Sequence, residues 1–366
     1  MNIQELQIVH DKVVQAEFPE DIFGSNSSHF KVNFRHMAKI VHPDLYSGAK
    51  DSVKAMAHIT SSKLNDLYER AKKVDVDGTY GLRKSQVEEE KEEFNFVVTI
   101  KKQMYHLKEV LLEDDFFTIY GGYYLKEDGE RQEIIVKIAN TESENDFIEN
   151  DLRISKILQE PDDEYDFGKH LPVLLGRFKT SDNQLASIWQ KIDGYDLFEV
   201  REKYPKGVPQ EHVVWMLNRI LTVLGFAHEK GIVHGNIDPS RIFIRPRDHN
   251  GWLCDWSCAV NLPKKTGEQF KVWNKDYSAP EVKDKASPLP SADMYSLGKT
   301  MMYLLGGDVL TNEMPSCVDI RLQRLIRYFV LGSPYGRASD AWQTRHHLRE
   351  IRREVFGPDR FREFRM

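Results

Sequence analysis

Residues 233–244 read VHGNIDPSRIFI, and this stretch decides how the whole chain is interpreted. It carries four polar side chains in close succession: His234, Asn236, Asp238 and Arg241. The segment before it, 212–231, predicts a long helix, and the apolar residues at its end predict a strand. The stretch is therefore predicted to be a polar loop between a helix and a strand, and the remaining sequence indicates what this loop does.

The composition describes an ordinary acidic protein with room for two or three domains. The chain has 366 residues, of which 40% are apolar, and a formal net charge of −6. This balance gives no support to nucleic acid or an anionic membrane as a partner. No run of about 18 apolar residues occurs, and the start MNIQELQIVHDK does not look like a signal peptide. We therefore expect a cytoplasmic protein without a membrane-spanning segment.

Cysteines are too few to organise the fold. The chain has three, Cys254, Cys258 and Cys317, an odd number without a partner Cys/His pair at zinc-finger spacing. Reduced, mostly buried thiols are expected.

The hydrophobic periodicity predicts several domains, of α and then α+β class. We expect a helical domain at residues 1–75, a charged linker at 76–93, a strand-rich lobe at 94–192 and a helical lobe at 193–366. Residues 3–16 predict a first helix. Two further helices follow from stripes at Phe30, Phe34, Met37 and Val41, and at Val53, Met56, Thr60, Leu64, Leu67 and Ala71. Alternation at Phe94, Phe96, Val98 and Ile100 predicts a strand, and the segments 116–125 and 131–139 around KEDG predict a hairpin.

A His-Pro-Asp tripeptide, His42, Pro43 and Asp44, separates the second and third predicted helices. Pro43 ends the preceding helix, because it lacks an N–H and fixes φ. The two flanking side chains are thereby expected on an exposed tip. Arg35 and Lys39, four residues apart, would present a basic face beside it.

The stretch FRHMAKIVHPD at 34–44 resembles the end of the second helix and the loop of a J domain, the chaperone-activating module of the DnaJ family. The family pattern of aromatic-Arg-x-Leu-Ala before His-Pro-Asp is filled by Phe34, Arg35, Met37 and Ala38. The resemblance implies that the tripeptide and the basic face bind a DnaK-type chaperone and stimulate its ATPase.

From about residue 95 to 350 the order of features resembles a protein kinase domain, which implies a bilobal fold with a mainly β N-lobe and a helical C-lobe. VHGNIDPSRIFI matches the catalytic loop H-R-D-L-x-x-x-N, with its histidine at His234. Lys137 stands at the phosphate-binding lysine of the third strand, and Asp151 near the glutamate that pairs with it. Glu149 is a weaker candidate for that partner. Asp255 in CDWS matches the metal-binding aspartate of D-F-G.

Three further positions match structural residues of the same family. SAPEV at 278–282 matches A-P-E with Glu281, and Arg337 stands where the family keeps the arginine that pairs with this glutamate. In SADMYSLG at 291–298, Asp293 matches the aspartate that braces the catalytic loop.

The catalytic parts of the pattern are replaced. The stretch LLEDDFFTIY, which matches the glycine-rich loop, has no glycine and carries Glu113, Asp114 and Asp115. Asn236 stands at the catalytic base, and an amide cannot take up a proton usefully; losing a general base typically costs about 10²–10⁴ in rate. Asp238 replaces a lysine near the γ-phosphate, and Arg241 replaces an asparagine that binds the second metal. These replacements together predict a pseudokinase.

Nucleotide binding stays open at this point. Lys137, Asp151 and Asp255 are the residues that would hold ATP, with Asp255 as a candidate Mg²⁺ ligand. Arg241 could replace the metal as the cation that neutralises phosphate, so that ATP would bind without Mg²⁺. Alternatively, Lys137 and Asp255 form only a structural ion pair.

The sequence therefore predicts a co-chaperone or adaptor that recruits a DnaK-type chaperone and binds a client or partner protein through a pseudokinase domain. One alternative is an atypical kinase or other transferase of phosphoryl or AMP groups, with Asp238 as a displaced base. Another is an interaction module in which neither site is active. Residues 349–366 interleave arginine and phenylalanine, and we expect an amphipathic helix with a short capping segment rather than a docking tail.

Overall fold

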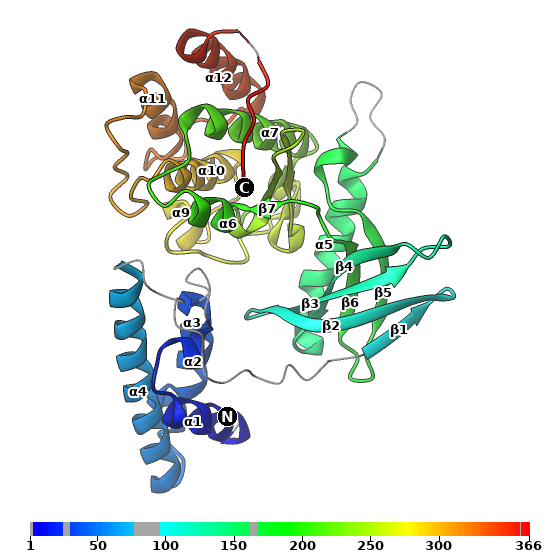
Figure 1. Cartoon of the computed structure of the whole chain (residues 1–366), viewed down its shortest axis with the longest axis vertical. Coiled ribbons are helices and arrows are strands. Elements are labelled where there is room, and N and C mark those ends of the chain that lie inside the picture. Colours follow the sequence, from blue (N-terminus) through cyan, green and yellow to red (C-terminus); the bar gives the residue numbers. More distant parts are fainter. Residues whose placement is uncertain (1–2, 25–29, 77–95, 161–166, 359) are drawn as a thin grey trace. The chain divides into compact units, whose positions relative to one another are not determined.

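The structure is a computed structural model that describes residues 3–24, 30–76, 96–160, 167–358 and 360–366 (Figure 1). The chain divides into two compact units, residues 1–95 with 112–115 and residues 96–111 with 116–366. Most of the predicted linker 76–93, together with Phe94, lies outside the described residues.

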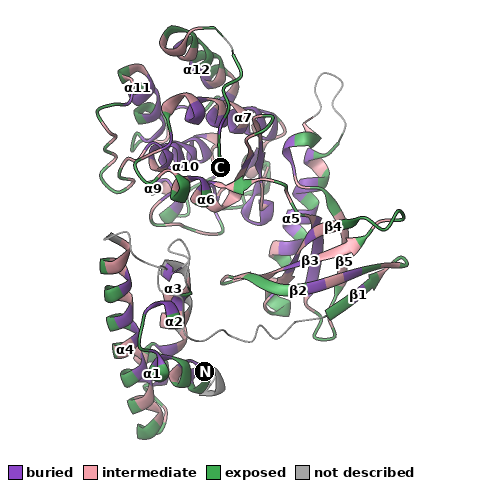
Figure 2. Ribbon diagram, in the orientation of Figure 1, coloured by how far each residue is buried: buried purple, intermediate pink, exposed green. Residues whose placement is uncertain are grey.

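The N-terminal unit is helical, as its periodicity predicts. Its elements are α1 (Ile3–Gln15), α2 (Glu20–Phe23), α3 (Phe30–Val41), the short 3₁₀ helix η1 (Pro43–Tyr46) and α4 (Asp51–Val76). Both predicted stripes face one core, in which Phe30, Val41, Leu64, Leu67 and Ala71 are buried (Figure 2). The short α2 was not predicted from the sequence.

Aromatic contacts fix the directions of α3 and α4. The ring of Phe34, early in α3, stacks on Tyr68, late in α4, with 3.8 Å between ring centroids. Phe23 of α2 meets both rings edge to face. Because the start of α3 contacts the end of α4, the two helices pack antiparallel, with His-Pro-Asp in the connection between them.

The second unit begins with a six-stranded antiparallel sheet in the order β1-β2-β3-β4-β6-β5. The strands are β1 (Phe96–Ile100), β2 (Gln103–Glu113), β3 (Phe117–Leu125), β4 (Arg131–Ala139), β5 (Leu174–Lys179) and β6 (Leu185–Gln190). The predicted hairpin is β3–β4, paired from Phe117 with Ala139 to Leu125 with Arg131. One helix, α5 (Asn145–Leu158), lies against this sheet (Figure 1).

Alternation along β4 gives the sheet two different faces. Ile134 and Val136 join a core with residues of β1 and β2, whereas Ala139 joins Ile148 and Leu152 of α5. Successive side chains of a strand point to opposite faces, so Lys137 shares its face with Ala139, towards α5.

The rest of the unit is mainly helical around one large core. Its helices are α6 (Leu197–Lys203), α7 (Gln210–Glu229), α8 (Pro263–Thr266), α9 (Pro280–Lys283), α10 (Pro290–Leu304), α11 (Ile320–Phe329) and α12 (Ala341–Phe356). The short strand β7 (Tyr195–Asp196) comes directly before α6, and four more lie between α7 and α8: β8 (Ile232–Val233), β9 (Ile242–Arg245), β10 (Asn250–Leu253) and β11 (Val260–Asn261). The polar loop of the opening stretch thus lies between β8 and β9, with α7 before it.

The C-terminal helix agrees with the sequence-based prediction, whereas the exposure of the cysteines differs from it. The predicted final helix is α12, and Phe364 in the segment after it is buried beside α7. The thiols are free but not mostly buried: Cys258 is buried, Cys254 is partly exposed and Cys317 is exposed. Among the described residues, no helix is long and apolar enough to cross a membrane, and no group of three metal-ligating side chains forms.

Candidate active site

Lys137 lies between two carboxylates contributed by different elements. Its Nζ donates to Asp151 Oδ2 of α5 at 2.9 Å and to Asp255 Oδ1 at 2.5 Å. Asp151 shares a helix face with Ile148 and Leu152, which pack on the sheet, whereas Glu149 is exposed. The shorter aspartate therefore does reach the lysine, and Glu149 does not supply the partner.

Asp255 sits in a conformation that few non-glycine residues adopt. Its φ of 62° and ψ of 70° lie in the left-handed region. The turn after it is held by α5, because the backbone N–H of Trp256 donates to Asp151 Oδ1 at 3.0 Å. The surrounding contacts thus maintain a strained backbone at the site, as is frequent where position matters for function.

The backbone of the catalytic-loop stretch is fixed by one buried carboxylate, that of Asp293. Asp293 of α10 accepts from the backbone N–H groups of His234 and Gly235, each at 2.8 Å, and its Oδ2 lies 2.9 Å from His228 Nε2. Gly235 has a φ of 75°, which favours glycine, where the family pattern has arginine. The ring of His234 is buried, with its Nε2 3.1 Å from the carbonyl of Cys254.

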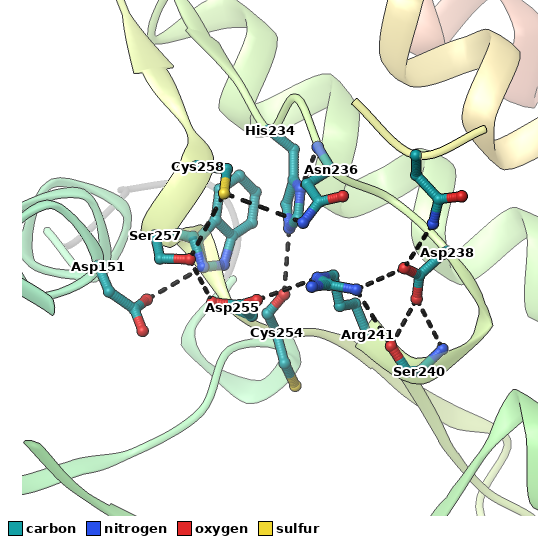
Figure 3. Close-up of polar contacts among 12 residues, drawn as sticks. Asp151, His234, Asn236, Asp238, Ser240, Arg241, Cys254, Asp255, Ser257 and Cys258 are labelled. Carbon is teal, nitrogen blue, oxygen red and sulfur yellow. Dashed lines mark hydrogen bonds and ion pairs between the residues drawn. The ribbon is translucent and has the colours of Figure 1, made fainter. Parts of the chain in front are cut away.

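Arg241 occupies the centre of the loop (Figure 3). Its Nε donates to Asp255 Oδ2 at 3.0 Å, and its Nη1 donates to Asp238 Oδ2 and to Ser240 Oγ. The amide of Asn236 is satisfied when its oxygen faces Arg241, 3.0 Å from Nη2. Arg241 thus ties together the three positions that hold base, phosphate contact and metal in the family pattern.

Asp238 has little capacity left to act as a base. Besides Arg241, it accepts from the backbone N–H and hydroxyl of Ser240 through Oδ1 and from Asn274 Nδ2 through Oδ2. Asn236 has no titratable group. Neither predicted catalytic residue is therefore placed as a free proton acceptor.

We call Lys137, Asp151, Asp238, Arg241 and Asp255 the charge cluster. Burial raises the pKa of Asp151, against the charge of Lys137. Burial would also raise the pKa of Asp255, but the charges of Lys137 and Arg241 outweigh it and hold that pKa far below its usual value. Burial likewise lowers the pKa of Lys137 less than its two carboxylate partners raise it. The cluster is therefore a network in which two cations are each held between two of three carboxylates.

The cluster does not fit Mg²⁺. Magnesium needs several oxygen ligands at short distance, whereas both oxygens of Asp255 already face cationic nitrogens. The guanidinium of Arg241 cannot bind a cation. The role of Asp255 as a possible Mg²⁺ ligand stays a prediction, which this arrangement of its two oxygens does not favour. A phosphate would be met by the N–H donors of Lys137 and Arg241, which here donate to the carboxylates of the cluster.

The predicted structural pair of the C-lobe forms. Arg337 Nη2 donates to Glu281 Oε2 of α9 at 2.7 Å, and the arginine side chain is fully buried. This pair ties α9 to the segment before α12.

In the N-terminal unit, His42 and Asp44 lie on an exposed tip. Their side chains are 58% and 89% exposed, with 3.7 Å between His42 Nδ1 and Asp44 Oδ2. Tyr46 is buried just beyond them and donates to the carbonyl of Ile40 at 2.7 Å, which holds the tip against α3. The side chains of Arg35 and Lys39 lie outside the described residues.

Comparison with known proteins identifies the second unit. The protein kinase domain family matches residues 122–347, more than half of the chain. The chain belongs to the protein kinase family.

Individual relatives and a solved structure agree with this family. The kinase domain is 28% identical over 209 residues to serine/threonine-protein kinase D of Synechocystis sp., a match covering 50% of this chain and 40% of the relative. It is 25% identical over 198 residues to serine/threonine-protein kinase nekl-2 of Caenorhabditis elegans, covering 49% and 51%. The chain thus spans about half or less of these relatives. The structure of vaccinia related kinase 3 aligns with a TM-score of 0.55 at 16% identity, covering 72% of this chain and 91% of that one, and supports the bilobal fold.

Sequence reasoning missed several residues that build this kinase site. The amide of Asn150, next to Asp151, donates to the carbonyls of Trp256, Ser257 and Ala259, at 2.8 to 3.3 Å. His228 and Asn274 add contacts to Asp293 and Asp238. These residues could not be recognised from the sequence, because each one hydrogen-bonds to a group that is distant along the chain.

Proposed function

We propose that the kinase domain is a binding domain that does not transfer phosphate by the metal-dependent route of its family. The observation that carries this proposal is Arg241, whose guanidinium bridges Asp238 and Asp255. An arginine held there by two carboxylates excludes a divalent cation and leaves Asp238 without a free lone pair for a substrate proton. The same arginine, with Lys137, supports a cation-lined phosphate site that binds ATP without Mg²⁺.

The test is a calorimetric titration of the full chain with ATP, in Mg²⁺ and in EDTA. Equal binding under both conditions, lost in Arg241→Ala, is expected. Arg247→Ala is a charge-matched control, because Arg247 lies a few residues away in an exposed pair with Asp193. Binding that requires Mg²⁺ would refute the metal-free site. Absence of ATP binding in both conditions would mean that the ion pairs of Lys137 and Arg241 are structural. The domain would then be a scaffold that binds proteins.

We further propose that the N-terminal unit acts as a J domain, which recruits a DnaK-type chaperone to whatever the kinase domain binds. Support comes from the antiparallel α3 and α4 with an exposed His42 and Asp44 in their connection. Asp44→Asn should abolish stimulation of the chaperone ATPase, whereas Asp66→Asn, on the surface of α4, should leave it unchanged. Full stimulation by Asp44→Asn would refute this role.

The second candidate is an atypical ATP-dependent transferase. It is favoured by the named relatives, which are serine/threonine kinases, and by the intact pairing of Lys137 with Asp151. Such an enzyme would move the γ-phosphoryl group and release ADP, or move AMP and release pyrophosphate. Label from ATP appearing on protein, and lost in Asp255→Ala, would establish this activity and overturn the binding-domain proposal.

A further inference from the structure

A cavity of about 410 Å³ lies on the C-lobe, between α7, the β9–β10 turn, α12 and the segment after it. Pockets of this volume are in the range that holds small ligands. The lining includes six arginines: Arg219, Arg345, Arg349, Arg352, Arg360 and Arg362. Two carboxylates of the described residues line it, Glu211 and Asp248. We call it the arginine cavity.

Both carboxylates are already engaged by arginines. Arg362 Nη1 lies 3.0 Å from Glu211 Oε1, and Asp248 accepts from Arg245, which is not part of the lining, at 2.6 Å. Arg362 is therefore matched by a lining carboxylate, and Arg345 and Arg352 make further interactions of their own. Among the described lining residues, arginines still outnumber carboxylates. The cavity has an excess of positive charge.

The helix α12 places three of these arginines on one face. Arg345, Arg349 and Arg352 follow one another at spacings of four and three residues, which brings their side chains to the same side of a helix. Leu348, between them, is buried under the cavity. Among the described residues, Arg349 forms no ion pair and is exposed.

The opposite wall is rigid and aromatic. The ring of His249 is stacked between Trp215, at 4.2 Å, and Phe361, at 4.4 Å between centroids. His249 has a φ of 51°, and its carbonyl accepts from Arg219 Nε at 2.8 Å, which fixes that guanidinium against the turn. A held guanidinium recognises an anion at a lower entropic cost than a mobile one.

Two buried polar atoms at this wall lack a hydrogen-bond partner in the described part of the chain, Asn218 Oδ1 and His249 Nε2. Buried polar atoms are nearly always satisfied, so such a pair in one cavity indicates that water or a ligand completes it. Asn218 Oδ1 can only accept and therefore needs a donor such as a water or a ligand hydroxyl, whereas His249 Nε2 can donate to an anion when it carries the proton. The excess of arginines is what favours an anionic occupant.

We propose that the arginine cavity binds a small organic polyphosphate, a molecule with two or more phosphate groups close together. Guanidinium groups bind phosphate through two parallel N–H donors, and several of them around one cavity suit several phosphates. Six arginines around one cavity exceed what a single phosphate can contact, and the volume suits a small molecule. The site is separate from the charge cluster, and the proposal does not depend on the kinase domain binding ATP there.

The test uses calorimetric titration of the full chain with three probes: inorganic tripolyphosphate, inositol hexakisphosphate and metal-free ATP. Saturable binding of at least one probe, one per chain, is expected, with affinity falling as salt is raised. Arg349→Gln should weaken that binding about tenfold, and Arg349→Glu more, since each removes charge-assisted hydrogen bonds from an exposed position.

Arg353 supplies the matched control. It is exposed on α12 and does not line the cavity, so Arg353→Gln and Arg353→Glu change the same charge on the same helix. If the Arg349 and Arg353 variants weakened binding equally, the net charge of α12 and not contact with Arg349 would explain the affinity. That result would refute a binding site in the arginine cavity. Absence of saturable binding by all three probes would also overturn it.

The three probes identify the source of the phosphates once binding is seen. Stronger binding of ATP than of tripolyphosphate, lost in Phe361→Ala, would indicate a nucleotide whose base extends the aromatic stack. Stronger binding of inositol hexakisphosphate would indicate a cyclitol polyphosphate. Because Arg349 lies on α12 of the helical lobe and Lys137 on β4 of the strand-rich lobe (Figure 1), ATP binding to the charge cluster should survive Arg349→Gln. The two proposals can therefore fail separately.

Discussion

The charge cluster and the arginine cavity both gather positive charge in the kinase domain, but they balance it differently. In the cluster, Lys137 and Arg241 each bridge two of three carboxylates at hydrogen-bonding distance. In the cavity, six arginines face two carboxylates of the described residues, and Arg349 among them forms no ion pair with a described residue. Removing one partner of a buried ion pair leaves an uncompensated charge, whereas removing an exposed, unpaired charge does not. Mutation should therefore cost stability in the cluster, and ligand binding but little stability in the cavity.

The largest effect is expected at Lys137. Lys137→Met removes the cation between two buried carboxylates and should lower the free energy of unfolding by about 3–5 kcal/mol. Urea unfolding followed by tryptophan fluorescence measures this in the full chain, because all six tryptophans lie in the kinase domain. Lys156→Met, at an exposed position on α5, is the control. A decrease in the free energy of unfolding below about 1 kcal/mol would mean that the charge cluster contributes little to the stability of the fold.

A smaller loss is expected at Arg241. Arg241→Ala should cost about 2–3 kcal/mol, because Asp255 keeps Lys137, and Asp238 keeps Ser240 and Asn274, when the guanidinium is removed. Arg247→Ala, in an exposed pair, should change stability little in the same unfolding measurement. Increased stability in Arg241→Ala would show that this arginine is kept for ligand binding at the expense of the fold.

Lowering the pH should reduce the free energy of unfolding through His170, a buried residue near the arginine cavity. Burial, with the nearby charges of Arg219 and Lys169, lowers the pKa of His170 to about 4, against a hydrogen bond to the carbonyl of Gly251. The unfolded chain therefore binds this proton first, and stability falls as pH drops from about 6.5 towards 4. Between pH 7 and 5 the loss from His170 is about 2 kcal/mol.

Comparison of variants isolates this contribution. Urea unfolding at both pH values should show a smaller acid loss in His170→Asn than in the wild type, whereas His346→Asn, with a side chain 79% exposed, should match the wild type. An unchanged pH dependence in His170→Asn would mean that burial and the nearby charges do not lower the pKa of His170 in the folded chain.

The smallest effect on stability is expected within the cavity itself. Arg349→Gln should leave the free energy of unfolding within about 0.5 kcal/mol of the wild type, because the side chain is exposed and forms no ion pair with a described residue. The same urea titration provides the measurement. A loss comparable to that of Arg241→Ala would remove the contrast between the two regions.

Much of this architecture follows from local sequence. The stripes of α3 and α4, the β3–β4 hairpin and the position of Lys137 on β4 are visible because side-chain period alone separates helix from strand. The family is visible in the sequence for a different reason, because the motifs around Asp255, Glu281 and Asp293 occur in the order that protein kinases share. The N-terminal J domain stays a prediction, which the helical arrangement supports.

What the sequence determined by itself is which chemical groups are present: an amide at Asn236 and a guanidinium at Arg241, where the family pattern has a base and a metal ligand. Only the tertiary structure decided what these groups contact. Asp151 reaches Lys137 because α5 is packed at a fixed depth on the sheet, and Asn150 reaches the carbonyls after Asp255 for the same reason. The arginines of α7, α12 and the final segment become one cavity only when those elements pack together, since charge spacing along a chain says nothing of distances between helices.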